Sequence, residues 1–243
     1  MEALVSVIVP ALNESLRIAR AVNSAFAAGA GEVIVVDGGS TDDTTQQAEQ
    51  AGALVVRSQP GRAVQQNAGA ELARGNVLLF LHADNWLDVD TIQQISQHCQ
   101  SRAHVAGAFR QSIDAVGLAY RILEHGNALR AGWLGRPYGD QGIFVDKQLF
   151  ADVGCFADVP LMEDVLIMRQ IRRHLRPALL TGPIHVDARR WQQGGIIRQT
   201  LRNWSLLAAH TLGWSPARLA RFYPPHQTPM HQSTVISHYT ARG

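Results

Sequence analysis

Lysine and cysteine are scarce in this chain of 243 residues, and long apolar runs are missing. Lys147 is the only lysine, so arginine carries nearly all of the positive charge. Arginine suits bidentate binding of phosphate, but we attribute this bias first to genome composition. The formal net charge of +2 is too small to indicate nucleic-acid binding.

The two cysteines, Cys99 and Cys155, cannot form a disulfide framework, and neither lies in a C-x-x-C or metal-ligand spacing. A reducing cytosol is the simplest setting for such a chain. Residues 1–9 lack the basic region of a signal peptide. No run of about 18 apolar residues is present that could cross a membrane. The sequence therefore predicts a cytoplasmic protein, with contact to the inner face of the membrane left open.

What is present is an ordinary globular composition, with 46% apolar and 17% charged residues. In the first hundred residues, short apolar runs alternate with helical stretches. The pattern predicts strands at 5–9, 32–36, 54–57 and 77–81, and helices at 15–28, 41–51 and 62–73. Strands that are apolar throughout and separated by helices indicate a parallel sheet covered on both faces. The second half is less regular, with strands expected at 105–113 and 141–145 and helices at 117–130, 165–175 and 195–212.

In a parallel sheet the carboxyl ends of the strands share one edge, where ligands bind. Asp37 ends the second predicted strand ahead of two glycines, and its carboxylate can accept hydrogen bonds from a base or a ribose. A turn-forming aspartate is the alternative. After the first strand, Asn13 or Ser15 could simply cap a helix. Ser40 with an acid three residues later resembles a capping box.

His82 and Asp84 follow the fourth predicted strand and point to the same side of an extended chain. A carboxylate at this edge, with a nitrogen or oxygen neighbour, can hold a divalent ion. Mg²⁺ typically takes only one or two protein carboxylates and is completed by phosphates and water. An Asp-Asn pair such as Asp84-Asn85 is also common in simple turns, so both interpretations stay open here.

Two later segments carry charged groups. Glu163 and Asp164 stand at a predicted helix start, where Asp164 could be a general base, although the helix dipole alone favours acids there. Arg189 and Arg190 precede Trp191, and two guanidinium groups beside an indole suit a diphosphate and a sugar face. An ordinary basic patch with a packed tryptophan is the alternative.

Four segments resemble, in their order, the family 2 glycosyltransferases of the GT-A fold. They are V-I-V-P-A-L-N-E at 7–14, V-V-D-G-G-S-T-D at 35–42, G-R-A-V-Q-Q-N-A-G at 61–69 and F-L-H-A-D at 80–84. Glu163-Asp164 resembles the "E-D" element of the family, and Arg189-Arg190-Trp191 a shortened Q-x-x-R-W element. The resemblance spans about residues 4–222.

The H-A-D, P-Y-G-D-Q-G and M-E-D elements are most similar to a small stand-alone bacterial subgroup. Its members are labelled radical-SAM- or selenodomain-associated transferases, or arsenosugar-biosynthesis transferases. These labels describe gene neighbourhood more than chemistry.

The resemblance implies an α/β protein of the GT-A fold, with a Rossmann-like, mostly parallel sheet and C-terminal helices. One domain would cover 1–222, with a nucleotide-binding half at about 1–100 and an acceptor half at about 101–222. Independently of the resemblance, the polar composition of residues 223–243, with Pro224 and Pro225, predicts a mobile tail. The implied donor is a nucleotide-sugar, with UDP preferred, the cofactor is Mg²⁺ or Mn²⁺, and the acceptor hydroxyl is unknown.

The resemblance also assigns roles by position. Asp164 would be the catalytic base, supported by Glu163. The nucleotide would contact Pro10, Asn13, Glu14, Asp37, Gly39, Arg62 and Asp84. The diphosphate or the acceptor would contact Asp140, Gln141, Arg190 and Trp191. Asp84 would bind the metal, with His82 and the distant His185 as further candidate ligands.

Two departures from the family pattern bear on this assignment. His82 stands where the first acid of D-x-D is usual, and the Q-x-x-R-W element lacks its glutamine, with Ala188 preceding Arg189. With no protein nucleophile required, the anomeric configuration should invert. The alternatives are a catalytically weak nucleotide-sugar-binding protein and a sugar nucleotidyltransferase, although residues 10–14 lack the Gly-rich basic loop of the latter. The helix at 195–212 could lie on a membrane, but core packing or a homodimer contact is the preferred interpretation.

Overall fold

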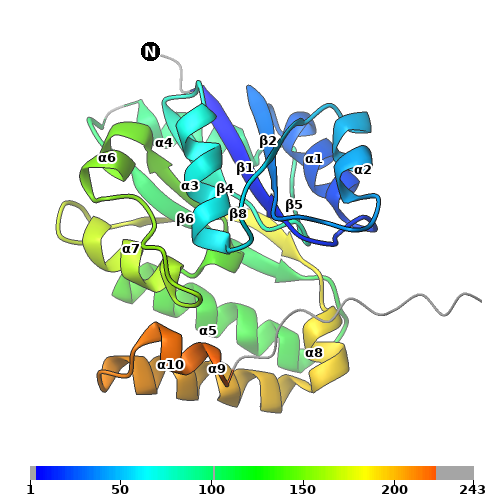
Figure 1. Cartoon of the computed structure of the whole chain (residues 1–243). Coiled ribbons are helices and arrows are strands. Elements are labelled where there is room, and N and C mark those ends of the chain that lie inside the picture. Colours follow the sequence, from blue (N-terminus) through cyan, green and yellow to red (C-terminus); the bar gives the residue numbers. More distant parts are fainter. Residues whose placement is uncertain (1–3, 101, 223–243) are drawn as a thin grey trace, which may run out of the picture.

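The computed structural model describes residues 4–100 and 102–222, which fold into a sheet of eight strands covered by helices (Figure 1). The strands are β1 (Val5–Ala11), β2 (Glu32–Asp37), β3 (Leu54–Arg57), β4 (Val77–Phe80), β5 (Asn85–Leu87), β6 (Ala106–Ile113), β7 (Ile143–Asp146) and β8 (Ala178–Val186). The helices are α1 (Ile18–Ala27), α2 (Thr44–Gln50), α3 (Arg62–Leu72), α4 (Thr91–Cys99), α5 (Leu118–Leu134), the short 3₁₀ helix η1 (Gly139–Gln141), α6 (Lys147–Asp152), α7 (Glu163–Ile171), α8 (Arg189–Gly194), α9 (Ile196–Thr211) and α10 (Pro216–Ala220).

The strands lie in the order β3-β2-β1-β4-β7-β6-β8-β5. The predicted parallel arrangement is confirmed for β1 to β4. The second half is mixed, because β7 runs antiparallel to both β4 and β6, while β6 and β8 are parallel. The chain passes from β1 to β2 on one side and returns to pair β4 with β1 on the other. The carboxyl ends of β1 and β4 therefore flank a crevice of the kind in which α/β sheets bind ligands.

Two apolar clusters explain why the central strands carry apolar side chains on both faces. Successive side chains of a strand point to opposite faces, so Val7 and Val9 pack under α1, α2 and α4. Ile8, between them, packs with residues of α3, α6 and α7 on the other face. Burial on both faces removes the polar-apolar alternation that a half-exposed strand would show.

Helices α5, α8, α9 and α10 form a further layer at the side of the sheet away from α1 and α2 (Figure 1). The helix expected at 195–212 is confirmed as α9. The tail expected at 223–243 lies outside the described residues. No helix within the described ranges has the length and apolar character needed to span a membrane.

Strand β8 is the main element that the pattern did not predict. Its residues read A-L-L-T-G-P-I-H-V, and Gly182 and Pro183 interrupt the apolar run as a loop would. The strand forms nevertheless, because it pairs with β6 on one side and β5 on the other, with an irregular register between Phe109 and Gln111 of β6.

Candidate active site

The loops that follow β1 and β2 are tied to each other by side chains. The backbone N–H of Asn13 donates to Ser40 Oγ at 2.9 Å, and the N–H of Thr41 donates to Asn13 Oδ1 at 2.9 Å. Helix α1 begins only at Ile18 and has no side-chain cap, and α2 likewise has none. The capping interpretations of Asn13 and Ser40 are therefore wrong, because both side chains join the two loops instead.

Asp37 ends β2 with a side chain that is 1% exposed. Its carboxylate accepts backbone N–H groups of Gly39 at 3.2 Å and Ser40 at 3.1 Å, which is the turn-forming arrangement. Gly39 has a φ of 99°, which favours glycine, and nothing lies within 4 Å of where its Cβ would be. Asp37 therefore shapes a loop whose glycine is open to a ligand.

A buried amide that sequence reasoning missed bridges β1 and β2 beside this loop. Gln65 of α3 donates through Nε2 to the carbonyl oxygens of Ala11 at 2.8 Å and Val36 at 2.7 Å. Pro10 lies buried in β1 opposite Val36. The hydrogen bonds of Gln65 thereby hold α3, β1 and β2 together at this edge of the sheet.

Asp84 follows β4 and is 7% exposed. Its Oδ2 accepts from Arg189 Nη2 at 3.2 Å and from Arg190 Nη2 at 3.3 Å, and Arg189 also donates to Glu14 Oε1 at 2.7 Å. Burial alone would raise the pKa of Asp84, but the guanidinium groups of Arg190 and Arg189 oppose it, and the pKa is lowered to about 2. Asp84 is thus a carboxylate at neutral pH.

His82 lies beside Asp84 and is neutral at the same pH. Burial, together with the positive charges of Arg62 and Arg190, lowers the pKa of His82 to about 4, although Asp84 and Asp164 favour protonation. An ionised carboxylate and a neutral imidazole are the protonation states in which these groups bind metals.

The structure does not bring His185 to Asp84. The ring of His185 stacks on Trp86 with centroids 5.2 Å apart, and its Nε2 lies 2.9 Å from Asp88 Oδ1. Among the residues that the structure describes, no three His, Cys, Asp or Glu side chains are grouped so as to hold a metal ion. Of the predicted metal ligands, only His82 and Asp84 share one site.

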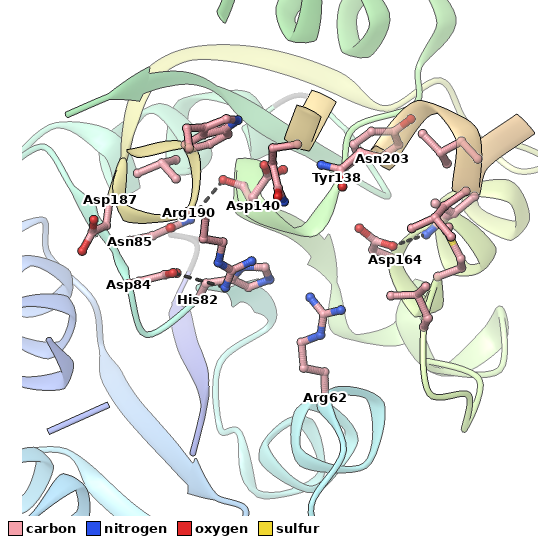
Figure 2. A pocket seen from close by; sticks show the side chains of 18 residues that line it. Arg62, His82, Asp84, Asn85, Tyr138, Asp140, Asp164, Asp187, Arg190 and Asn203 are labelled. Atoms are coloured by element: carbon pink, nitrogen blue, oxygen red, sulfur yellow. Dashed lines mark hydrogen bonds and ion pairs between the residues drawn. The ribbon is translucent and has the colours of Figure 1, made fainter. Parts of the chain in front are cut away.

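A cavity extends from Asp84 to α7 and α9 (Figure 2). Figure 2 shows His82, Asp84 and Arg190 on one side, Asp164 on the other, and Arg62 pointing from α3 into the space between them. The residues that line the cavity are Arg62, His82, Asp84, Asn85, Tyr138, Asp140, Leu161, Met162, Asp164, Val165, Val186, Asp187, Arg190, Trp191, Gln199, Asn203, Leu206 and Leu207.

Asp164 lies in the first turn of α7, and backbone groups orient its carboxylate. Oδ2 accepts the N–H of Gly139 at 2.7 Å, and Oδ1 accepts the N–H of Val165 at 2.8 Å. The neighbouring Glu163 is 3% exposed and pairs with Arg62 Nε at 3.0 Å. Burial raises the pKa of Glu163, as does the nearby Asp164, while Arg62 lowers it. Glu163 thus holds Arg62 in place. Of the two neighbouring acids, Asp164 is the one that lines the cavity.

The expected contact of Gln141 with the diphosphate or acceptor is not supported. Its side chain is 0% exposed, and Oε1 accepts from Arg130 Nη2 at 2.8 Å and from the N–H of Tyr138 at 3.2 Å. Gln141 therefore braces the loop that carries Gly139. Asp140 does line the cavity, and burial raises its pKa despite Arg130.

Several lining residues were missing from the predicted set. Asp187 follows β8, which the pattern did not reveal, and its Oδ2 accepts from Arg17 Nε at 2.7 Å. Gln199 and Asn203 are four residues apart on α9 and reach the cavity from the same face of the helix. Gln199 and Asn203 share their side of α9 with Leu206 and Leu207. Two polar residues on an otherwise apolar side of a helix were the signal in the sequence that could have identified them.

A family model and solved structures place the chain among known proteins. A family model described as "Glycosyl transferase family 2" matches residues 6–157, more than half of the chain. This range contains Asp37 and Asp84 and ends before Asp164. A search of curated proteins finds no match.

Solved structures share the fold at low sequence identity. The S. aureus TarS fragment 1–349 in complex with UDP is 20% identical with a TM-score of 0.61, over 76% of this chain and 60% of that one. Glucosyl-3-phosphoglycerate synthase from Mycobacterium tuberculosis, with Mn²⁺, UDP and glucosyl-3-phosphoglycerate, is 20% identical with a TM-score of 0.55, over 76% and 70%. The mannosyltransferase PcManGT from Pyrobaculum calidifontis, with GDP-Man and Mn²⁺, is 19% identical with a TM-score of 0.58, over 77% and 57%. The chain thus spans about 60% of the length of the TarS fragment.

Proposed function

The chain belongs to glycosyl transferase family 2, and on this premise we propose that it transfers a sugar from a nucleotide-diphosphate donor to an acceptor hydroxyl. One observation carries the proposal. An ionised Asp84 with two arginines faces Asp164 across a single cavity, at the carboxyl end of β4. The complexes of TarS with UDP and of PcManGT with GDP-Man support a nucleotide donor, and we take UDP as the first candidate.

The nucleotide would lie along the carboxyl edge of β1 and β2. Asn13 joins the two loops by accepting the N–H of Thr41, and Asp37 fixes the shape of its own loop by accepting the N–H of Ser40. Their proposed role is therefore to shape the edge that contacts base and ribose, with Gly39 offering close approach, the buried Pro10 supporting the edge from within β1, and Glu14 positioning Arg189.

The side chains of Asp84 and His82 could serve as ligands of a divalent cation. Asp84 is ionised and His82 is neutral, and Mg²⁺ or Mn²⁺ would complete its ligands from phosphate and water. When bound, such a cation stabilises the negative charge that develops on the leaving diphosphate. The synthase from M. tuberculosis was crystallised with Mn²⁺ and with Mg²⁺, which supports this assignment.

Two arginines extend the same electrostatic function into the cavity. Arg190 pairs with Asp84, and Arg62 pairs with the buried Glu163, so both guanidinium groups are held in place before a donor arrives. Fixed positive groups in a site of low water content stabilise developing charge without reorganisation. We assign both arginines to the diphosphate, and Trp191 to the sugar or acceptor side.

Asp164 is the proposed base. The N–H of Gly139 fixes the direction of its carboxylate, and the cavity gives an acceptor hydroxyl access to it. The acceptor oxygen would attack the anomeric carbon, its proton would pass to Asp164, and the bond to the diphosphate would break. A single displacement with no protein nucleophile inverts the anomeric configuration.

The alternative of a nucleotide-sugar-binding protein without turnover rests on His82, which occupies the position of an acid. Donor hydrolysis separates the two. We would incubate the protein and Mg²⁺ with UDP-glucose, UDP-galactose, UDP-N-acetylglucosamine and GDP-mannose, and quantify free UDP or GDP by chromatography. Slow release that disappears in Asp164→Asn supports the transferase. Tight donor binding by calorimetry with no release would favour the binding protein, and binding of none of the donors would overturn the proposal.

A further inference from the structure

Helix α9 presents two different faces. Gln199, Asn203, Leu206 and Leu207 line the cavity, at the spacing that places side chains on one side of a helix. Leu206 also packs with Leu161 of the loop before α7. The inner face of α9 is therefore part of the site.

The outer face is apolar and open to solvent. Ile197 is 76% exposed, Leu201 57%, Trp204 61% and Leu212, just after the helix, 82%. The spacing of Ile197, Leu201 and Trp204 again follows one side of the helix. The sequence favoured core packing or a homodimer contact for the stripe with Trp204, and core packing is wrong for this side chain. A row of large apolar side chains in water is typical of an interaction surface.

The segment that carries this face has charges of one sign. From residue 188 to the last described residue, 222, the sequence contains no Asp or Glu. Its charged residues there are six arginines, of which Arg189 and Arg190 pair with Glu14 and Asp84 in the site. The four that remain are Arg198, Arg202, Arg218 and Arg221. Arg198 and Arg218 are exposed. Basic side chains beside exposed tryptophan and leucine are what amphipathic helices present to anionic lipid.

The same charge argues against a second copy of the chain as the partner. A twofold interface joins the same patch of both subunits, so the arginines would meet arginines. An anionic bilayer instead offers opposite charge at its surface and an apolar layer beneath the headgroups. Figure 1 shows α9 and α10 at the outer side of the molecule, away from α1, α2 and α3, where a flat surface can approach.

We propose that the outer face of α9, formed by Ile197, Leu201 and Trp204 with the neighbouring arginines, docks on an anionic lipid bilayer. Because the inner face of the same helix lines the cavity, docking sets the site beside the membrane. The binding requires no sugar donor, so its failure would leave the proposed transferase function untouched.

Vesicle co-sedimentation of the full chain tests the proposal. We expect binding to vesicles of phosphatidylglycerol mixed with phosphatidylcholine, little binding to pure phosphatidylcholine, and release by salt. The double variant Leu201→Glu with Trp204→Glu removes two apolar contacts from an exposed surface, so it should fold normally and lower the partition coefficient by roughly tenfold or more. Leu72→Glu is the matched control, since Leu72 is 49% exposed on α3.

Circular dichroism melting checks that the double glutamate variant and the Leu72→Glu control keep the fold. A second α9 variant, Leu201→Ser with Trp204→Ser, removes the same apolar side chains without adding charge. Equal partition of the wild type and both α9 variants would overturn the proposal, as would equal binding to neutral and anionic vesicles. Absence of vesicle binding, with a dimer in sedimentation equilibrium that the α9 variants dissociate, would overturn it in favour of an interface between copies.

Discussion

Replacing Asp164 with asparagine tests whether this side chain is a base or only an acid at a helix start. The change keeps the size of the group and removes its proton affinity. If Asp164 accepts the proton of the acceptor, transfer or slow donor hydrolysis should fall by about 10² to 10⁴-fold. Donor affinity should change little, because the proposed base addresses the acceptor hydroxyl and not the nucleotide.

The stability cost of this change follows from two hydrogen bonds. The carboxylate accepts the N–H groups of Gly139 and Val165, whereas an asparagine side chain has one acceptor oxygen. In the variant, the N–H of either Gly139 or Val165 would face the amide NH₂ group and lose its acceptor. The other N–H would keep its hydrogen bond, but to a neutral oxygen in place of a carboxylate oxygen. We expect unfolding free energy to fall by about 1–3 kcal/mol. For a domain of this size, each kcal/mol lowers Tm by about 2–4 °C.

The assay is donor hydrolysis at 25 °C, well below the melting transition, with calorimetric UDP affinity measured in parallel. Asp158→Asn is the control, because Asp158 is an exposed acid a few residues before Asp164. Near-wild-type turnover in Asp164→Asn would refute the assignment of the base. Asp140, which lines the same cavity and has a raised pKa, would then be the next candidate.

Three further outcomes are expected. Asp84→Ala should weaken UDP binding in Mg²⁺ and abolish its sensitivity to EDTA, and calorimetry showing equal or tighter binding would mean that Asp84 only balances the neighbouring arginines. Asp37→Ala should cost about 1.5–3 kcal/mol of UDP binding, since a charged anchor of the loop is lost, and unchanged UDP affinity would remove Asp37 from the site. Glu32 is buried, which raises its pKa, but hydrogen bonds from Ser6 and Arg74 outweigh this and hold the pKa below its ordinary value of 4.5. Its stabilisation is therefore complete above that pH and is lost as the pH falls through the lowered pKa. Urea titrations should accordingly show a weaker loss of stability in acid for Glu32→Gln than for the wild type.

The order and type of the elements in the first half were predictable, because their signals are local. An apolar run such as β1 and the helical spacing of α1 and α3 can be read without knowing their neighbours. The same holds for Asp164, because an acid at the start of an amphipathic segment is visible in the sequence. Metal dependence, the inverting outcome and the subgroup stay predictions.

Tertiary structure decided which of the predicted polar residues reach the cavity. Arg190 meets Asp84 across 106 positions of sequence, a contact that depends on the pairing of β8 with β5 and β6. Within β8, Val186 lines the cavity, and alternation along the strand turns the preceding His185 to the other face, onto Trp86. Gln141 is drawn inward because Arg130 and the N–H of Tyr138 need a buried acceptor. Local sequence encodes the elements, whereas strand register and buried hydrogen bonding choose the side chains of the site.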